Sequence, residues 1–478
     1  MLIRHIIGYT PSLFIPAITA FVSIFLYTRI LETSDYGYYT LVLSIMTLLN
    51  AVFFYWLQVS VPRLIPEYER NEKLESLKTT TYIAHGLMSL IMLCGVISLE
   101  FLFPISSIPS EVIWLSLALA FVRALLNMNQ AFHKSLLNFK KYNILECGQA
   151  VLGLVIGVIL VYCFNMGVAG AIYGMVAAIA IMLLTDIKII TTIIFRKFSY
   201  NELVQIFRLG WPLVLTFALG FIVSSSDRFI LGHYCGADDL GVYAAGYNLA
   251  DRIMTLVFML VATPSFPLTI HKLENEGHDS ANRQVFRNGE VLALLAIPAA
   301  GGLIMAAPQL AEILVGEDFR SGVREILPWI TVSSFLNGIT SHYFYYAFHL
   351  AKRPKLFLVA QLPIAVINII LNVILIQKYD YMGAVYSTVI SYFLLMVMSI
   401  ILGRLTFKIT FPVKTPLYTA CAVLVMCMAL RTIDFSLDVK GLIEMVIVGF
   451  IAYISTMLLF NVMSLRTELV RLITSRLK

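Results

Sequence analysis

Two arginines lie near the middle of long apolar segments, where a charged side chain is costly. Arg123 falls within the apolar run 110–134 and Arg252 within the run 239–268. A guanidinium at the centre of a bilayer costs about 2.5–3.5 kcal/mol on insertion scales, so such groups face a hydrated cavity or a counter-ion. Arginine stays protonated, and its planar fork matches phosphate oxygens. Both residues are therefore candidate binders of an anionic headgroup. The alternative is a structural ion pair with Glu146 or Asp251.

Two acidic residues lie in similar apolar segments. Glu146 falls in the run 143–164, and Asp251 directly precedes Arg252. Consecutive helical residues point about 100° apart, so we expect no ion pair between Asp251 and Arg252. Carboxylates inside a membrane are typical of proton or cation pathways. Glu146 and Asp251 are thus the candidates for coupling transport to a proton or sodium gradient.

A second pair of arginines lies at the outer ends of two predicted spans. Arg29 is near the end of the run 7–31, and Arg228 is near the end of the run 205–229. Arginines near helix ends commonly extend to the membrane interface. A role in substrate binding is the alternative that we keep for both.

Amide and tyrosine side chains in the later spans also have two interpretations. Amides on one helix face most often bond to neighbouring helices, and tyrosines near a span end most often form an interfacial belt. Contact with sugar hydroxyls, or stacking on sugar rings, is the alternative. The residues are Gln361, Asn368 and Asn372 in one set and Tyr343, Tyr345 and Tyr346 in the other.

The segments that position these side chains predict an all-α polytopic membrane protein. Of 478 residues, 59% are hydrophobic and 13% are charged, and a helical span needs about 20 mostly apolar residues. The polar stretches Pro62–Lys78 and Thr269–Glu290 are too short for a soluble catalytic domain. Fourteen transmembrane helices are predicted, near 7–31, 36–60, 79–103, 110–134, 143–164, 168–194, 205–229, 239–268, 287–307, 325–350, 355–377, 383–404, 413–433 and 439–463.

The distribution of basic residues predicts the orientation of the chain. If the N-terminus is cytoplasmic, 25 of the 34 Lys and Arg residues lie on the inner side and 7 on the outer side, with Arg123 and Arg252 inside spans. This alternation follows the positive-inside rule with both termini cytoplasmic. The net charge of +6 therefore requires no nucleic-acid partner. The six cysteines show no metal or redox spacing, so we expect free thiols, no metal and no cofactor.

Short sequence matches recur in the same order in two halves of the chain. Their offsets are 202, 199, 204, 202, 216 and 213 residues. The matched segments are Gly8–Pro11 with Gly210–Pro212, Thr28–Leu31 with Asp227–Ile230, Asp35–Tyr39 with Asp239–Tyr243, Pro62 with Pro264, Ala131–His133 with Ala347–His349, and Gly170–Tyr173 with Gly383–Tyr386.

These matches predict three regions in the chain. Residues 1–198 form an N-lobe of six helices, residues 199–410 form a C-lobe of six, and residues 411–478 hold two extra helices and a cytoplasmic tail. The offset covers an even number of spans, so both six-helix repeats have the same orientation. Parallel repeats of this kind occur in transporters, with the substrate path between the halves.

The motifs resemble those of polysaccharide flippases, of the O-antigen translocase type, in the MATE-like multidrug/oligosaccharidyl-lipid/polysaccharide exporter superfamily. The resemblance rests on Leu209–Leu213, Asp227–Gly232, Leu240–Tyr243, Thr28–Leu31, Tyr36–Tyr39 and Pro62–Tyr68. It implies a V-shaped pair of six-helix bundles around a cationic cavity in a bacterial cytoplasmic membrane.

The resemblance also implies a function, a substrate and roles for named residues. The family moves polyprenyl-pyrophosphate-linked oligosaccharides from the cytoplasmic to the outer leaflet. Arg123 and Arg252 would bind the headgroup, with Arg29 as a second candidate. Two extra helices form a groove for the polyprenyl tail in related lipid flippases. Membrane lipids surround such a protein, and a polysaccharide polymerase is the protein partner that the resemblance suggests.

Two other classes of function compete with a flippase. A multidrug antiporter of the same superfamily would favour acidic cavity residues, whereas the two mid-span arginines favour an anion. A membrane polymerase or glycosyltransferase usually carries a sizeable outer loop, but the longest outer connector here is about Pro308–Arg324. We therefore predict a transporter and not an enzyme.

Overall fold

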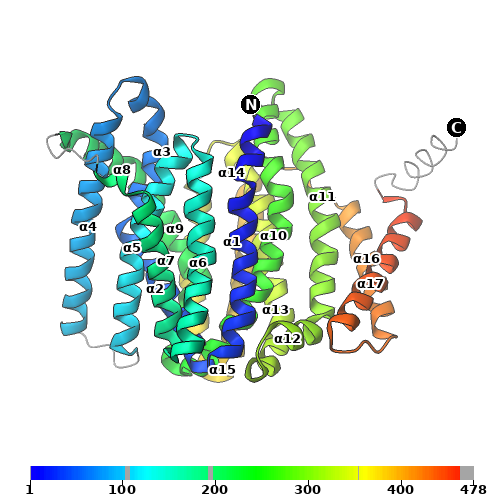
Figure 1. The fold of residues 1–478 in the computed structure, drawn as a ribbon. Helices are drawn as coiled ribbons and strands as arrows, with labels where there is room; N and C mark the ends of the chain where they lie inside the picture. Colours follow the sequence, from blue (N-terminus) through cyan, green and yellow to red (C-terminus); the bar gives the residue numbers. More distant parts are fainter. Residues whose placement is uncertain (1, 103–107, 192–196, 354, 463–478) are drawn as a thin grey trace. The chain divides into compact units, whose positions relative to one another are not determined.

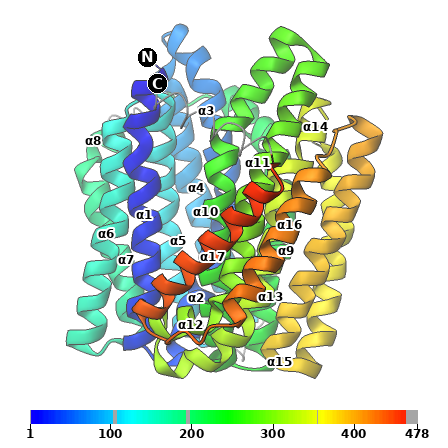
Figure 2. The same ribbon diagram turned by 90° about the vertical axis from the view of Figure 1, so that its right-hand side faces the viewer.

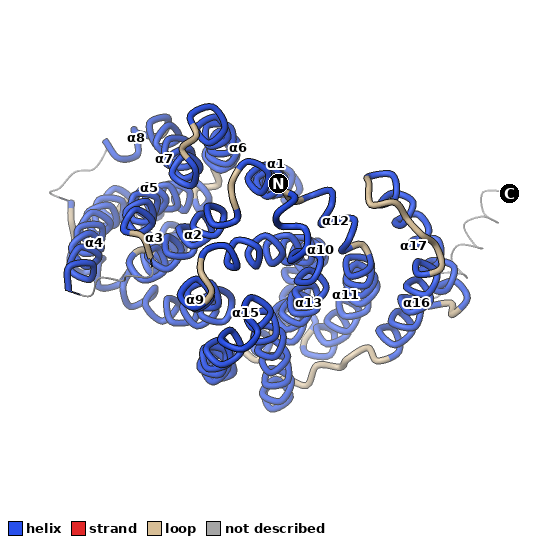
Figure 3. Tube along the Cα trace, turned by 90° about the horizontal axis from the view of Figure 1, so that it is seen from below, coloured by secondary structure: helices blue, strands red, loops and turns tan. Residues whose placement is uncertain are grey.

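The described part of the chain is almost entirely helical. The computed structural model describes residues 2–102, 108–191, 197–353 and 355–462, and within these ranges it contains no strand (Figure 1). Seen along the helices, short loops connect long helical rods (Figure 3). The chain falls into two compact units, Met1–Gly241 and Val242–Lys478. Each is described separately.

The first unit begins with nine helices and ends in the first turn of a tenth. Their bounds are α1 Leu2–Ile30, α2 Thr33–Phe53, α3 Tyr55–Arg70, α4 Leu74–Leu102, α5 Ser110–Ser135, α6 Phe139–Phe164, α7 Gly167–Thr185, α8 Ile187–Thr191, α9 Tyr200–Tyr234 and α10, which starts at Ala237 and continues to Glu276.

Helix α9 packs closely on α3 within the first unit. A Cβ atom at Gly210 would lie only 2.1 Å from the Trp56 carbonyl oxygen, so the absence of a side chain permits the contact. The Ser60 hydroxyl donates to the Ile206 carbonyl at 2.8 Å across the same interface. Ile206 and Val214 of α9 share a buried cluster with Trp56. This packing explains why α9 belongs to the first unit.

The first turns of α2 and α10 cross at two glycines. A Cβ at Gly37 would lie 2.0 Å from the Ala237 carbonyl oxygen, and a Cβ at Gly241 would lie 2.0 Å from the Thr33 carbonyl oxygen. The Thr33 hydroxyl donates to Asp238 Oδ1 beside this crossing. Gly37 and Gly241 occupy matching positions in the predicted repeats, and the contact is reciprocal.

The second unit contains the rest of α10 and the C-terminal helices. Their bounds are α11 His278–Met305, α12 Ala307–Leu314, η2 Glu317–Phe319, α13 Arg320–Ile339, the π-helix η3 Thr340–Phe344, α14 Tyr346–Leu350, α15 Lys355–Thr406, α16 Lys414–Arg431 and α17 Val439–Leu459. Helices α16 and α17 lie side by side and pack against α11 (Figure 2). Asp438 caps α17, because its carboxylate accepts the Gly441 amide hydrogen at 2.8 Å.

Helix α15 is two helices that meet at Asp380, where φ is 51° and ψ is −136°. The halves are joined by a buried amide network. Asn368 Nδ2 donates to Ser391 Oγ at 3.0 Å, and Asn372 Nδ2 donates to Asn368 Oδ1 at 3.1 Å. Both asparagines are fully buried. Their role is helix packing, which was the more common of the two interpretations.

The predicted membrane architecture is confirmed at the level of helices. Among the described residues, eleven helices are long and apolar enough to cross a membrane. One of them, α15, covers two predicted spans, 355–377 and 383–404. Helices α13 and α16 occupy two further predicted positions without being among the eleven. The number of fourteen crossings and the repeat arrangement remain predictions.

Some predicted spans differ from the observed helices. The span 36–60 breaks at Phe54, where the Trp56 indole donates to the Phe53 carbonyl at 2.9 Å. The span 168–194 breaks at Asp186 between α7 and α8. The span 325–350 contains the π-helix.

The unit boundary at Gly241 also lies beyond the predicted repeat boundary at 198/199, because α9 packs on α3. Shared ancestry and spatial compactness are different properties, so the repeat boundaries remain predictions. The predicted tail, 463–478, lies outside the described residues.

Candidate functional site

Arg123 lies on α5 within the first unit, close to α6. The two helices are joined by the short turn 136–138, and Asn138 caps α6 by accepting the Lys141 amide hydrogen at 3.3 Å. Arg123 is half-buried and interacts electrostatically with Tyr142 of α6. Among the described residues it makes no hydrogen bond and has no carboxylate within 4.0 Å. The expected alternative, an ion pair with Glu146, is therefore absent.

Tyr142 links Arg123 electrostatically to Glu146, and Glu146 in turn contacts Gln130 of α5. Gln130 Nε2 donates to Glu146 Oε2 at 2.6 Å, so an amide and not the guanidinium satisfies this carboxylate. The Tyr142 ring packs edge-on against the Tyr9 ring of α1, with centroids 5.5 Å apart. We call Arg123, Gln130, Tyr142 and Glu146 the Arg123 cluster. It combines a guanidinium that can accept an anionic ligand with a carboxylate held in place by a neutral donor.

The second mid-span arginine lies in the second unit. Arg252 of α10 is exposed, and no described residue forms an ion pair or a hydrogen bond with its side chain. Asp251 is half-buried and accepts a hydrogen bond from the Ser334 hydroxyl of α13 at 2.9 Å. The two consecutive side chains therefore point to different environments, as helix geometry predicts.

Arg29 and Arg228 have different environments despite their matching repeat positions. Arg29 is exposed at the end of α1, where Nη1 donates to the Phe25 carbonyl at 2.7 Å and the guanidinium lies 3.7 Å from the centre of the Phe25 ring. This geometry favours the helix-end interpretation for Arg29. Arg228 is half-buried in α9, next to the buried Asp227, whose carboxylate accepts the Arg228 amide hydrogen at 2.8 Å.

The sequence interpretation missed a buried polar network around Asp186. This carboxylate is only 6% exposed. It lies 2.9 Å from His133 Nε2, accepts the Asn129 amide at 2.9 Å, and lies 3.7 Å from Lys141 Nζ. The Tyr82 hydroxyl donates to Asn129 Oδ1 at 2.6 Å. The network joins α4, α5, α6 and the α7–α8 break.

A signal for this network was present in the sequence. Asp186 falls inside the predicted span 168–194, and an acidic residue there requires a partner. The partner could not be chosen from sequence because it depends on which helices become neighbours. The half-buried His133 and Lys141 lie beside the carboxylate, and the buried Asn129 amide donates to it, so we assign the network a structural role.

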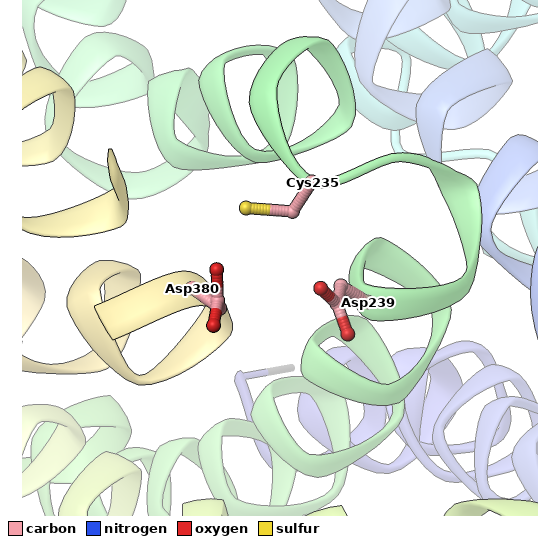
Figure 4. Close-up of side chains that lie close together, drawn as sticks. All are labelled: Cys235, Asp239 and Asp380. Atoms are coloured by element: carbon pink, nitrogen blue, oxygen red, sulfur yellow. The ribbon is translucent and has the colours of Figure 1, made fainter. Parts of the chain in front are cut away.

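Figure 4 labels three residues whose side chains could bind a metal ion. Cys235 ends α9 and Asp239 lies in the first turn of α10, both within Met1–Gly241. Asp380 lies at the bend of α15 and belongs to Val242–Lys478. We assign no joint site to residues of separate units.

The long apolar helices, with polar groups placed inside the spans, define a polytopic membrane protein. Residues 26–324, more than half of the chain, match the family described as "Polysaccharide biosynthesis protein", and the chain belongs to this family.

Similar proteins were found by sequence and by fold. A curated relative, "Probable low-salt glycan biosynthesis flippase Agl15" of Haloferax volcanii, is 25% identical over 224 residues, which is 46% of each chain. The alignment therefore spans about half the length of this relative. The fold resembles a solved structure titled "Lipid II flippase MurJ, inward closed conformation", with a TM-score of 0.74, 18% identity, and coverage of 95% of this chain and 99% of the other. It also resembles an inward-facing multidrug resistance MATE transporter of the MOP superfamily, with a TM-score of 0.66, 15% identity, and coverage of 82% and 93%.

The family match confirms the link to polysaccharide biosynthesis that the motifs suggested, and the solved structures show a fold shared with flippases and MATE transporters. The curated relative and these structures are named as flippases and transporters, in line with the predicted class. The protein is a multi-pass membrane protein. The bacterial cytoplasmic membrane, with both termini inside, remains a prediction.

Proposed function

We propose that the protein is a flippase that moves a polyprenyl-pyrophosphate-linked oligosaccharide from the cytoplasmic to the outer leaflet by alternating access. The family match and the similarity to a probable glycan biosynthesis flippase support a role in glycan assembly. The observation that carries the proposal is Arg123, a half-buried mid-span guanidinium with no carboxylate partner among the described residues. Such a group is costly unless it meets an anion during the transport cycle.

The pyrophosphate is the anion that suits the proposed headgroup site. Arg123 and Arg252 can each present a planar fork to phosphate oxygens, which allows bidentate, charge-assisted hydrogen bonds. Neither side chain is committed to an acidic residue of the described chain. Arg29 and Arg228 are secondary candidates, and the contacts of Arg29 with Phe25 make it the weaker of the two.

The polyprenyl tail has a candidate site in the second unit. A cavity of about 640 Å³ lies among α10, α11, α12, α16 and α17. Its lining is mainly aliphatic and aromatic, and it includes Pro298, Met445 and Tyr453. An apolar cavity in the hydrocarbon region can accept an isoprenoid chain without desolvating polar groups. The proposal gives α16 and α17, the two extra helices, a role in holding the tail.

Alternating access requires contacts that form and break. The crossing of α2 and α10 at Gly37 and Gly241 is a candidate outer gate, because the predicted orientation places it at the outer side. Its surfaces meet through backbone atoms and one exposed hydrogen bond between Thr33 and Asp238.

Glu146 and Asp251 remain the candidates for ion coupling. Glu146 accepts a hydrogen bond from Gln130, and Asp251 accepts one from Ser334. Transport that ignores the collapse of both proton and sodium gradients would exclude this role.

The experiment is complementation of a strain that lacks a glycan flippase. The wild-type gene should restore surface polysaccharide, while Arg123→Ala and Arg252→Ala should fail at equal membrane abundance. Normal polysaccharide from both variants would refute the headgroup role. Co-purification with a polysaccharide polymerase would test the proposed partner.

The second candidate function is ion-coupled multidrug export, which the fold likeness to a MATE transporter supports. The two mid-span arginines, Arg123 and Arg252, have no acidic partner among the described residues, and a cationic lining disfavours cationic drugs. Drug resistance conferred in a susceptible strain, without restored polysaccharide, would favour this alternative.

A further inference from the structure

A pocket within the second unit is lined by aromatic rings and two imidazoles. Its volume is about 220 Å³, and it lies between α10 and the segment 341–349. The predicted orientation places it toward the cytoplasmic end of the span 325–350. We call it the His–Tyr pocket, defined by Phe266, Ser341, His342, Tyr345, Tyr346 and His349.

The rings of this pocket hold one another in place. The His349 imidazole packs edge-on against Tyr345, with centroids 4.5 Å apart, and against Phe266 at 5.0 Å. Phe266 also contacts Tyr346 at 5.7 Å. Because each ring contacts another, the wall is organised before any ligand arrives, which reduces the entropic cost of binding.

Several polar atoms of the pocket are available to a ligand. The Tyr346 hydroxyl accepts a hydrogen bond from Asn288 Nδ2 at 3.4 Å. By contrast, the imidazoles of His342 and His349 and the Tyr345 hydroxyl have no hydrogen-bond partner among the described residues. Each can donate or accept, according to its tautomer or rotamer.

The backbone beside the pocket is unusual. Residues Thr340–Phe344 form a π-helix, and the chain returns to α-helix at Tyr346. A π-helix adds one residue to a helical turn and is found frequently at functional sites. Here the extra residue changes the register between α13 and α14, and His342 within it lines the pocket.

The His–Tyr pocket differs from the corresponding part of the first repeat, which contains the buried Asp186 network. Ala347–His349 matches Ala131–His133, so His349 corresponds to His133. In the first copy, His133 Nε2 lies 2.9 Å from Asp186. The offset of 213 residues between Gly170–Tyr173 and Gly383–Tyr386 places Ser399 at the position of Asp186. The buried Ser399 hydroxyl has no hydrogen-bond partner among the described residues. The second copy therefore lacks the carboxylate, and its histidine lines a pocket instead.

We propose that the His–Tyr pocket binds one pyranose ring of the transported glycan. Aromatic rings have electron-rich faces that attract the C–H face of a sugar, and the imidazoles and the phenol can bond to its hydroxyls. Pockets for drug-sized ligands span about 300–1,000 Å³, so the smaller volume here fits a single ring. No carboxylate, lysine or arginine lines the pocket, which favours a neutral sugar over a phosphate. This inference rests on the proposed function and adds a site that discriminates among sugars.

Saturation-transfer NMR on the full-length protein tests this proposal. The protein is placed in phosphatidylglycerol nanodiscs, which avoids sugar-based detergents. The probes are the methyl α-glycosides of glucose, galactose and N-acetylglucosamine. At least one probe should receive saturation, and Tyr345→Phe and His349→Gln should each weaken its binding about fivefold. The control is His271→Ala, an exposed histidine on α10 outside the pocket, which should bind as the wild type does.

Three outcomes would overturn the pocket assignment. They are no saturation of any glycoside, equal saturation in wild type and pocket variants, or complete displacement of the sugar by inorganic pyrophosphate. Thermal unfolding of each variant confirms that the folded protein was measured. Failure of the wild type to restore surface polysaccharide, with glycoside binding intact, would refute the proposed function alone. Restored polysaccharide without pocket-dependent binding would refute this inference alone.

Discussion

Removal of the Arg123 guanidinium should weaken headgroup binding about a hundredfold without unfolding the protein. The side chain makes no hydrogen bond and no ion pair with described residues, so Arg123→Gln leaves no orphaned carboxylate. Glu146 keeps its bond from Gln130. The thermal unfolding temperature should therefore stay within the error of the wild-type value. A structural arginine would not behave in this way, because loss of one member of a buried ion pair strongly destabilises a protein.

The magnitude follows from the bonds that a guanidinium can give to a pyrophosphate. A bidentate contact contains two charge-assisted hydrogen bonds, each contributing about 1.5–3 kcal/mol. If each of the two hydrogen bonds contributes the lower value, their loss costs about 3 kcal/mol of binding free energy, which corresponds to about a hundredfold weaker affinity. Arg123→Lys keeps the positive charge but lacks the planar fork, so this variant should bind the pyrophosphate about tenfold more weakly than the wild type.

Farnesyl pyrophosphate, a short-chain analogue, is a suitable probe for nanodisc-reconstituted protein. Its Kd is measured by calorimetry for wild type, both Arg123 variants and the control Arg70→Gln. The control removes an exposed arginine at the end of α3, outside the predicted spans, so we expect a change below about threefold. The argument would be refuted if Arg123→Gln and the wild type bound with equal affinity. It would also be refuted if the variant bound more weakly but unfolded at a lower temperature than the wild type.

Three further predictions address the gate, the buried network and the tail cavity. The double variant Thr33→Cys/Asp238→Cys should lose glycan transport when it is oxidised and regain transport when it is reduced. Each single variant should transport equally with and without the oxidant. Full transport by the cross-linked protein would contradict an opening gate. Asp186→Asn should lower the free energy of unfolding by about 3 kcal/mol, seen as a lower unfolding temperature, because His133 and Lys141 lose their counter-charge; an unchanged temperature would contradict the network. Met445→Trp should fill part of the 640 Å³ cavity. It should therefore weaken the binding of a long-chain polyprenyl pyrophosphate more than the binding of farnesyl pyrophosphate. Equal losses of affinity for the two lipids would show that the tail binds elsewhere.

The helical architecture was predictable because the bilayer imposes strong local rules. A spanning helix needs about 20 apolar residues, and breaks between such runs are visible in the sequence. The same rules identified Arg123, because a charged residue inside an apolar run can be recognised without knowledge of the neighbouring helices. The amide pair Asn368 and Asn372 was also recognised, since its helical spacing predicted a bonded face, and the structure shows the bonds.

The features that sequence could not predict depend on which helices become neighbours. The partners of Asp186 come from α5 and α6, and no local pattern links them to the end of α7. The π-helix at Thr340–Phe344 and the break at Phe54 replace regular helical bonds without a proline or glycine at the site. The repeat comparison matched His133 with His349 but could not show that only the first contacts a carboxylate.

Movement of a lipid-linked glycan by the purified protein is the most direct test of the central claim. Vesicles containing the protein are loaded with a fluorescent polyprenyl-pyrophosphate oligosaccharide, and a membrane-impermeant reagent reports the fraction in the outer leaflet over time. We predict protein-dependent movement that Arg123→Gln abolishes. A glycan lipid that stays in its original leaflet, while a cationic drug crosses the same vesicles, would contradict the account.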